Sequence, residues 1–297
     1  MERKSILGKM ALLSCAVIWG SSFFLMKNTI KDIPFNLLLT VRFWIGAIVI
    51  AFISRKRLHQ INYSYIKSGA ILGSIWFWAY WFQTIGLKET TPGKNAFLTA
   101  IYCVAVPYIT WIVKKKKPTK EQMIAGILCF IGIGLLSLDG NLTMGRGEFL
   151  TIICGILFSI HIFYLGNTIQ GKDTMLLTMM QFLFAGSWAA IVSITTENYN
   201  HIQVSTGMIS SMAYLVFMCT IVAVCFQSFG QKNVNSSAAS LILSFEAVFG
   251  VLFSVIFYGE KATLKIVLGF VFVMAAVLVS ETNIFEKSKK KEQLQYE

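Results

Sequence analysis

Long runs of apolar residues, separated by short polar segments, extend along almost the whole chain of 297 residues. A helix rises 1.5 Å per residue, so about 20 apolar residues cross the hydrocarbon core of a bilayer. The runs therefore predict ten transmembrane helices joined by short connections. Their expected bounds are Gly8–Lys27, Phe35–Ser54, Ile66–Leu87, Gly93–Val113, Gln122–Leu138, Gly147–Gly166, Met175–Thr195, Met208–Phe229, Asn235–Glu260 and Leu264–Ser280.

The composition indicates the same class of protein. Hydrophobic residues make up 56% of the chain and charged residues only 13%, with a mean hydropathy of +0.66. Soluble domains carry about 25% charged residues. Ten spans of about 20 residues leave only about 97 for connections and tails. We expect an all-α integral membrane protein without a separate soluble domain.

The net charge of +12 reflects membrane orientation rather than nucleic-acid binding. Basic residues cluster between apolar runs, at Arg55–Arg57, at Lys114–Lys117, and at Lys287 with Lys289–Lys291. Of the 26 Lys and Arg, 18 fall on the side of the two termini and seven on the other. The positive-inside rule then predicts a multi-pass protein of the cell (cytoplasmic) membrane with both termini in the cytoplasm. Membrane lipids are the expected neighbours of these clusters, and nucleic acid is not an expected partner.

An internal repeat divides the chain. Gly8–Ile30 aligns without gaps on Gly147–Ile169, 139 residues later, with six identities in 23 positions. At an offset of 143, Gly126 falls on Gly269, so the last spans of the two halves also correspond. Five spans per half is an odd number, so the halves must insert with opposite orientation. We expect two inverted five-helix repeats, at residues 7–139 and 147–281, and a cytoplasmic basic tail at 282–297. Inverted repeats with a site at their interface are typical of transporters.

Glu246 is the strongest candidate for a functional residue, because it lies near the middle of the ninth span. An ionisable group at that depth costs at least about 2.5–3.5 kcal/mol, so it rarely faces lipid. It predicts a substrate or proton site, and the alternative is a carboxylate in a structural hydrogen-bond network. Arg42, within the second span, either binds a substrate carboxylate or forms a structural pair with Glu246.

Other polar residues within the spans are weaker candidates. His161 matches Ser22 through the repeat, so both are expected to line a cavity, although a lone His on an apolar helix is often a packing residue. The remaining candidates for substrate binding are Tyr80, Gln83, Tyr102 and Gln227. No cofactor or metal is expected, since the chain lacks a P-loop, an HExxH motif, a CxxC pair and an acidic metal cluster.

Several segments carry a family resemblance: WGSSF at Trp19–Phe23, the Arg42-Phe43 pair, AFLTAIYCVAVP at Ala96–Pro107, and the block Phe226–Gly269. In these the chain resembles the drug/metabolite transporter (DMT) superfamily, specifically its EamA-type ten-span permeases. One departure is Ala247, where the family usually has a proline. The resemblance implies two inverted five-span repeats, a central cavity and alternating access for small metabolites.

Together these features predict a secondary transporter and not an enzyme. The resemblance favours export of amino acids or related compounds, with protons as a candidate coupling ion; uptake stays open. Two alternatives remain: an integral-membrane enzyme acting on lipid or lipid-linked substrates, and a non-transporting membrane sensor. Oligomeric state, substrate identity and direction are not predicted.

Overall fold

The computed structural model describes residues 2–115, 117–137, 144–200, 202, 204–261 and 263–281. The expected end of the first repeat at residue 139 and the basic tail 282–297 lie outside these ranges. Within them the elements are helices, with no β-strand.

The first half contains five helical stretches and a short 3₁₀ turn. In chain order these are α1 (Glu2–Thr29), α2 (Phe35–Ile53), η1 (Arg55–Gln60), α3 (Tyr63–Glu89), α4 (Pro92–Thr99) running into α5 (Tyr102–Lys114), and α6 (Lys120–Ser137). The second half comprises α7 (Arg146–Thr168), α8 (Thr174–Thr196), α9 (Thr206–Tyr214), the π-helical η2 (Leu215–Val222), α10 (Ala223–Asn233), α11 (Ser236–Leu243), α12 (Phe245–Phe253), the π-helical η3 (Ser254–Tyr258) and α13 (Leu264–Glu281).

Helix bounds in the second half follow those in the first at a nearly constant offset. α2 begins at Phe35 and α8 begins 139 residues later, at Thr174. The offset then becomes 144: α4 and α11 are both eight residues long and both of their ends are shifted by 144. α6 and α13 also begin 144 residues apart, at Lys120 and Leu264. The starts of α3 and α9, and those of α5 and α12, are 143 residues apart, which is the offset inferred from the glycines.

Seven stretches of the described residues are long and apolar enough to cross a membrane: Arg3–Thr29, Phe35–Ile53, Pro92–Lys114, Arg146–Thr168, Thr174–Thr196, Thr206–Asn233 and Ser236–Tyr258. Many large apolar side chains on the outside of the bundle are exposed, among them Ile48, Phe52, Ile194 and Leu264. A soluble monomer rarely exposes contiguous apolar surface of this kind, whereas a lipid-facing surface requires it. The fold is that of a multi-pass helical membrane protein.

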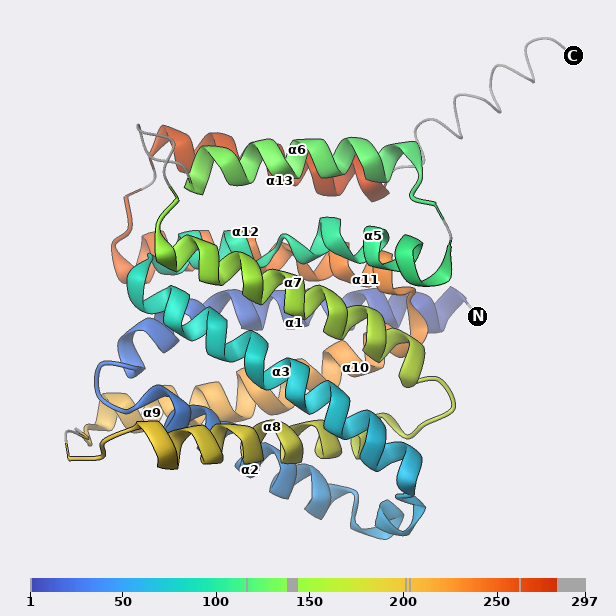
Figure 1. The fold of residues 1–297 in the computed structure, drawn as a ribbon, viewed down its shortest axis with the longest axis vertical. Coiled ribbons are helices and arrows are strands. Elements are labelled where there is room, and N and C mark those ends of the chain that lie inside the picture. Colours follow the sequence, from blue (N-terminus) through green and yellow to red (C-terminus); the bar gives the residue numbers. More distant parts are fainter. Residues whose placement is uncertain are drawn as a thin grey trace, which may run out of the picture.

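The helices lie side by side in one bundle (Figure 1), with α2 packed on α8 at one edge and α6 on α13 at the other. Between these edges α1 packs against α10 and α12, and α3 packs against α7 and α8. We call the end of the bundle where α1 begins the terminus side, and the opposite end the far side. Because α1, α7, α10 and α12 meet in the middle with α3 and α5, residues from both halves of the chain share the core.

Candidate functional site

Two of the long helices are interrupted near their centres. The first break separates α4 from α5 at Ala100 and Ile101, and the second separates α11 from α12 at Ser244. At the second break the Ser244 Oγ donates to the carbonyl of Leu241, at 2.7 Å, which offers the chain a local alternative to the regular helix ladder. The breaks begin 144 residues apart, at Ala100 and Ser244; Tyr102 is the first residue of α5 and Glu246 the second residue of α12. α4 packs against α12, and α5 against α11.

A small internal pocket lies beside these breaks, between α1, α3, α5, α7, α10 and α12. Its volume is about 20 Å³, which leaves room for about one water molecule. Its lining residues are Trp19, Ser22, Phe23, Tyr80, Gln83, Tyr102, Phe158, Ile162, Gln227 and Glu246. Six of the eight residues selected from the sequence therefore meet in one place, and Arg42 and His161 are not among the lining residues.

Eight of the ten lining residues form pairs related by the two offsets of the helix bounds. At an offset of 139 Trp19 matches Phe158 and Phe23 matches Ile162; at 144 Gln83 matches Gln227 and Tyr102 matches Glu246. Trp19, Phe23, Phe158 and Ile162 were not selected from the sequence. The repeat offset of 139 pointed to Phe158 and Ile162, because it relates them to the WGSSF segment.

Glu246 is 4% exposed and forms no ion pair with any residue in the described ranges. Its neighbour across the two breaks is the hydroxyl of Tyr102. That hydroxyl is itself buried and makes no hydrogen bond of ordinary distance and angle. Because a carboxylate without an ion pair is costly in an apolar interior, Glu246 and the Tyr102 hydroxyl beside it mark the polar part of the pocket.

The two glutamines of the pocket differ in their partners. Gln83 Nε2 donates to Thr99 Oγ1 at 3.2 Å, whereas Gln227, 1% exposed, has its Oε1 buried without a partner. The residue 144 positions after Thr99 is Leu243, which has no hydroxyl. The second half therefore has no oxygen at this position to accept an amide N–H from Gln227, as Thr99 Oγ1 does from Gln83, and the Gln227 Oε1 is in addition without a partner.

Arg42 is fully buried on α2, one layer behind the pocket. Its Nε donates to Thr220 Oγ1 in η2 at 3.1 Å and its Nη1 to Met26 Sδ at 3.2 Å. Its guanidinium carbon lies 5.3 Å from the ring centre of Tyr80, which lines the pocket. Arg42 therefore does not form the direct pair with Glu246 that was one of the two hypotheses for it.

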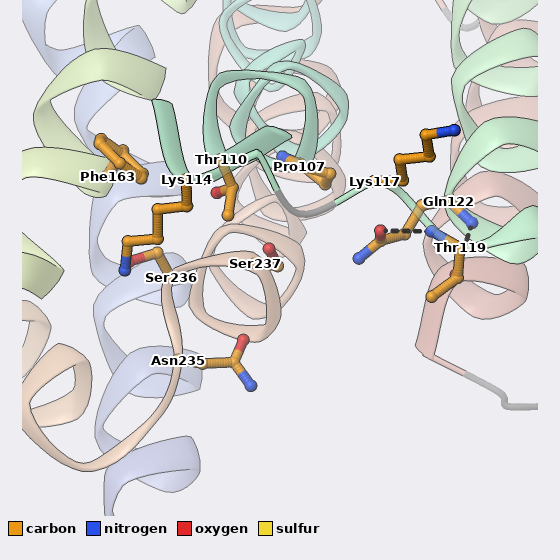
Figure 2. A pocket seen from close by; sticks show the side chains of 10 residues that line it. All are labelled: Pro107, Thr110, Lys114, Lys117, Thr119, Gln122, Phe163, Asn235, Ser236 and Ser237. Atoms are coloured by element: carbon orange, nitrogen blue, oxygen red, sulfur yellow. Dashed lines mark hydrogen bonds between the residues drawn. The ribbon is translucent and has the colours of Figure 1, made fainter. Parts of the chain in front are cut away.

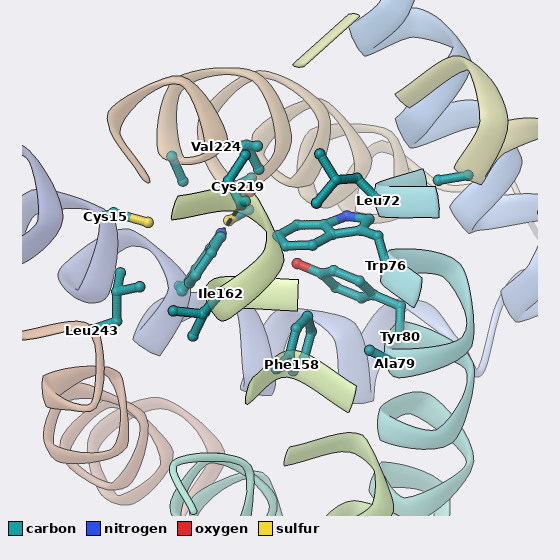
Figure 3. Close-up of a cluster of buried hydrophobic side chains, with 14 of the residues drawn as sticks. Cys15, Leu72, Trp76, Ala79, Tyr80, Phe158, Ile162, Cys219, Val224 and Leu243 are labelled. Atoms are coloured by element: carbon teal, nitrogen blue, oxygen red, sulfur yellow. Dashed lines mark hydrogen bonds between the residues drawn. The ribbon is translucent and has the colours of Figure 1, made fainter. Parts of the chain in front are cut away.

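His161 lies on α7 and points away from the pocket. Its Nε2 is hydrogen-bonded to Gln181 Oε1 of α8 at 2.9 Å, and its ring lies 4.5 Å from the ring of Trp76. Figure 3 shows Trp76 and Tyr80 of α3 beside Phe158 of α7 in this buried cluster. The neighbouring Ile162 lines the pocket instead, so in this state His161 supports the wall from behind.

A second, larger cavity of about 400 Å³ lies nearer the terminus side (Figure 2). It is lined by the ends of α5, α6, α7 and α11, and its residues are Pro107, Thr110, Lys114, Lys117, Thr119, Gln122, Phe163, Asn235, Ser236 and Ser237. Pro107 follows Tyr102 by five residues on the same helix, about 7 Å along its axis. Both cavities are therefore lined by the same two broken helices.

The far side is held together by polar contacts between elements. The Glu260 carboxylate accepts hydrogen bonds from Thr91 Oγ1 at 2.5 Å, from the Gly93 N–H at 3.0 Å and from Ser254 Oγ at 2.5 Å. It thereby caps the N-terminus of α4, where a negative charge is favourable. Lys27 Nζ donates to three carbonyl groups at the end of α3, those of Leu87, Lys88 and Thr90.

The described residues contain no group of three or more His, Cys, Asp or Glu that could hold a metal ion. The arrangement, a small pocket at paired helix breaks between two repeating halves of a helical membrane bundle, is typical of secondary transporters.

The comparisons with known proteins agree with this class. Residues 6–138 and 145–282 each match the EamA-like transporter family, so the chain belongs to that family, which is consistent with the DMT superfamily. A protein of Archaeoglobus fulgidus named "Uncharacterized transporter" is 30% identical over 282 residues, which cover 93% of this chain and 87% of the relative. "Uncharacterized transporter YyaM" of Bacillus subtilis is 24% identical, over 91% of this chain and 92% of the relative.

A solved crystal structure has the same fold. It superposes with a TM-score of 0.73, covering 92% of this chain and 96% of the other, at 13% sequence identity. These likenesses point to a transporter rather than an enzyme.

Proposed function

We propose that this protein is a secondary transporter that carries a small metabolite across the cell membrane by alternating access. The observation that carries the proposal is the lining of the small pocket, where four pairs of residues related by the repeat offsets face one another. A site on the axis between two inverted repeats is equally placed for access from either side. Amino acids or related compounds are the substrates we propose, with export as the direction.

The proposed topology is ten transmembrane helices in two inverted repeats, at 7–139 and 147–281, with both termini and the tail 282–297 in the cytoplasm. It adds α3, α6 and α13 to the seven stretches named above. α3 has 27 residues, and α6 and α13 have 18 each, about 27 Å of helix, which is close to the hydrocarbon thickness. The starts of α6 and α13, which lie 144 residues apart, support their assignment as the fifth span of each repeat.

The proposed cycle starts from the present arrangement. Polar contacts of Glu260 and Lys27 tie the far side, while the larger cavity gives room on the terminus side, which the proposed orientation places in the cytoplasm. The breaks at Ala100–Ile101 and at Ser244 allow the two ends of each broken helix to tilt separately, so opening one side can accompany closure of the other.

We assign direct substrate contact to six residues: Glu246, Tyr102, Gln227, Gln83, Ser22 and Tyr80. Glu246 binds either a charged group of the substrate or a proton that exchanges with it. Arg42 and His161 act indirectly in this state, through Tyr80 and Trp76.

The test is a transport assay in sealed proteoliposomes with a broad panel of metabolites, with and without a pH gradient. We expect at least one solute to move with the native chain and not with Glu246→Gln. Asp32→Asn, which removes a carboxylate outside the pocket, is the control and should transport normally. If native and Glu246→Gln proteins transport equally, Glu246 is structural. If no solute moves with the native chain, the sensor and enzyme alternatives gain support.

Orientation is tested separately with single introduced cysteines. Lys56 in η1 and Asn198 between α8 and α9 are exposed and lie at opposite ends of the bundle. In intact cells we expect a membrane-impermeant maleimide to label Asn198→Cys, and to label Lys56→Cys only after permeabilisation. The reverse pattern would contradict cytoplasmic termini.

A further inference from the structure

The small pocket presents several hydrogen-bond acceptors, beside the hydroxyl of Tyr102. Ser22 Oγ donates to the carbonyl of Trp19 at 2.7 Å, so its own proton is used and its lone pairs remain. Gln83 uses an amide proton on Thr99. The Gln227 Oε1 is buried without a partner, and the Glu246 carboxylate forms no ion pair among the described residues.

No cationic side chain lines the pocket to neutralise Glu246. The nearest guanidinium, that of Arg42, lies behind the ring of Tyr80 and donates to Thr220 and Met26. An anionic ligand would therefore meet a carboxylate without an opposing charge, which opposes its binding. A ligand that brings its own positive charge would supply what the pocket lacks.

The remaining wall is aromatic and suits a cation. Trp19, Tyr80 and Phe158 are all lining residues, and the rings of Tyr80 and Phe158 meet edge to face at 5.5 Å. Aromatic faces attract organic cations, the more so in a dry site. The pocket in this state has room for about one water molecule, which is also about the size of an ammonium group.

We propose that the substrate carries a protonated amine, which donates its N–H groups to the Glu246 carboxylate and to the Gln227 Oε1. This inference rests on the proposed function and narrows it to organic ammonium compounds with an apolar or aromatic portion. Gln227 becomes a specificity residue because its Oε1, the acceptor that the amine needs, is buried without a partner. The bulk of the substrate must displace lining side chains, since the closed pocket holds only the ammonium group.

The first measurement is equilibrium binding by calorimetry to the detergent-purified full chain. The probes are three compounds of similar shape: phenethylamine, 2-phenylethanol and 3-phenylpropionate. We expect only the amine to bind, and we expect Glu246→Gln to abolish its binding. Equal binding of the three, preference for the acid, or unchanged amine binding to Glu246→Gln would each overturn the inference.

Gln227 has a matched control on its own helix. Gln231 is also on α10 and also 1% exposed, but it does not line the pocket and donates to the carbonyl of Ile162. We expect Gln227→Leu to weaken amine binding about tenfold and Gln231→Leu to leave it unchanged.

Gln227→Glu, which keeps the acceptor and adds charge, should bind the amine more tightly. This variant keeps the test decisive if Gln227→Leu fails to fold. Weaker binding by both leucine variants, or no gain with Gln227→Glu, would contradict the assignment.

Competition in proteoliposomes separates this inference from the proposed function. If panel solutes move and the amines do not compete, transport stands and the amine assignment fails. If no panel solute moves and no amine binds, both fail.

Discussion

The two broken helices, α4–α5 and α11–α12, are alike in geometry and unlike in chemistry. Each has an eight-residue first part, and in each a residue of the pocket lies within two residues after the break. In the first half that residue is Tyr102, and in the second it is Glu246. The N-terminus of α4 is tied by the carboxylate of Glu260, whereas α11 is capped by its own Asn235 and opens on the larger cavity.

This difference shows that the two halves contribute different chemical groups to the pocket. The repeat explains why the pocket lies where the two breaks meet, because equal segments produce equal bends. It does not explain the charge, which only the second half supplies. The same holds for Gln83 and Gln227, which are the same residue in equivalent places. Their surroundings differ, because Thr99 accepts an amide N–H of Gln83, whereas Leu243 offers Gln227 no acceptor and the Gln227 Oε1 has no partner.

Removing the charge of Glu246, compared with removing the hydroxyl at the equivalent position Tyr102, should have the largest effect. We expect Glu246→Gln to lower transport at least about 30-fold, the loss of about 2 kcal/mol or more that follows removal of one buried charged partner. Tyr102→Phe removes a neutral hydroxyl and should lower transport only about two- to tenfold. The measurement is the initial rate of transport in proteoliposomes, and the melting temperature of each variant is the control for folding. Equal losses in the two variants would mean that the charge carries no special role.

Packing around the breaks also differs between the halves. A Cβ on Gly155 of α7 would lie 2.8 Å from the carbonyl oxygen of Thr99, beside the first break. The equivalent residue in the first half is Ala16, which is buried. Because the carbonyl belongs to the backbone, we expect Gly155→Ala to destabilise the protein by about 1–3 kcal/mol, and Ala16→Gly to have a smaller effect. Thermal unfolding in detergent measures both, and a neutral Gly155→Ala would show that the first break shifts easily.

Making the two glutamines alike should have the smallest effect. Leu243→Thr places a hydroxyl where Thr99 has one, and we expect its oxygen to accept an amide N–H of Gln227, as Thr99 does from Gln83. Amine binding should then strengthen about threefold, because one hydrogen bond of about 0.5–1.5 kcal/mol holds the amide in place and leaves its Oε1 available to the ligand. Leu243→Val, of nearly the same shape as Thr but without the hydroxyl, is the control. A Leu243→Thr protein that binds the amine more weakly than Leu243→Val does would argue against Gln227 Oε1 as the acceptor.

The helical stretches could be predicted from the sequence because apolar length alone sets them. The expected second span, Phe35–Ser54, differs from α2 by one residue, and the tenth, Leu264–Ser280, differs from α13 by one. The breaks could not be predicted, since Ala100, Ile101 and Ser244 include neither Gly nor Pro and the apolar runs continue through them. The family's proline position, Ala247, lies inside α12, so the break there does not depend on a proline.

Six residues of the pocket could be found from the sequence, because a polar side chain inside a membrane is costly unless it binds a partner or a ligand. The neighbours of Arg42 could not be predicted from the sequence, because the distance between Arg42 and Glu246 depends on how α2 packs against η2. The wall residues Trp19 and Phe158 carry no polar signal, and only the repeat relates them.

A pocket with room for about one water has a consequence for the membrane as a whole. A chain of hydrogen-bonded water molecules conducts protons, and a wide aqueous path lets ions leak down their gradients. The space beside Glu246 is too small for such a chain, and Glu260 and Lys27 tie the helix ends beyond it. We therefore expect the protein in this state to conduct no ions, so that a cell holding many copies would keep the ion gradients on which its energy supply depends.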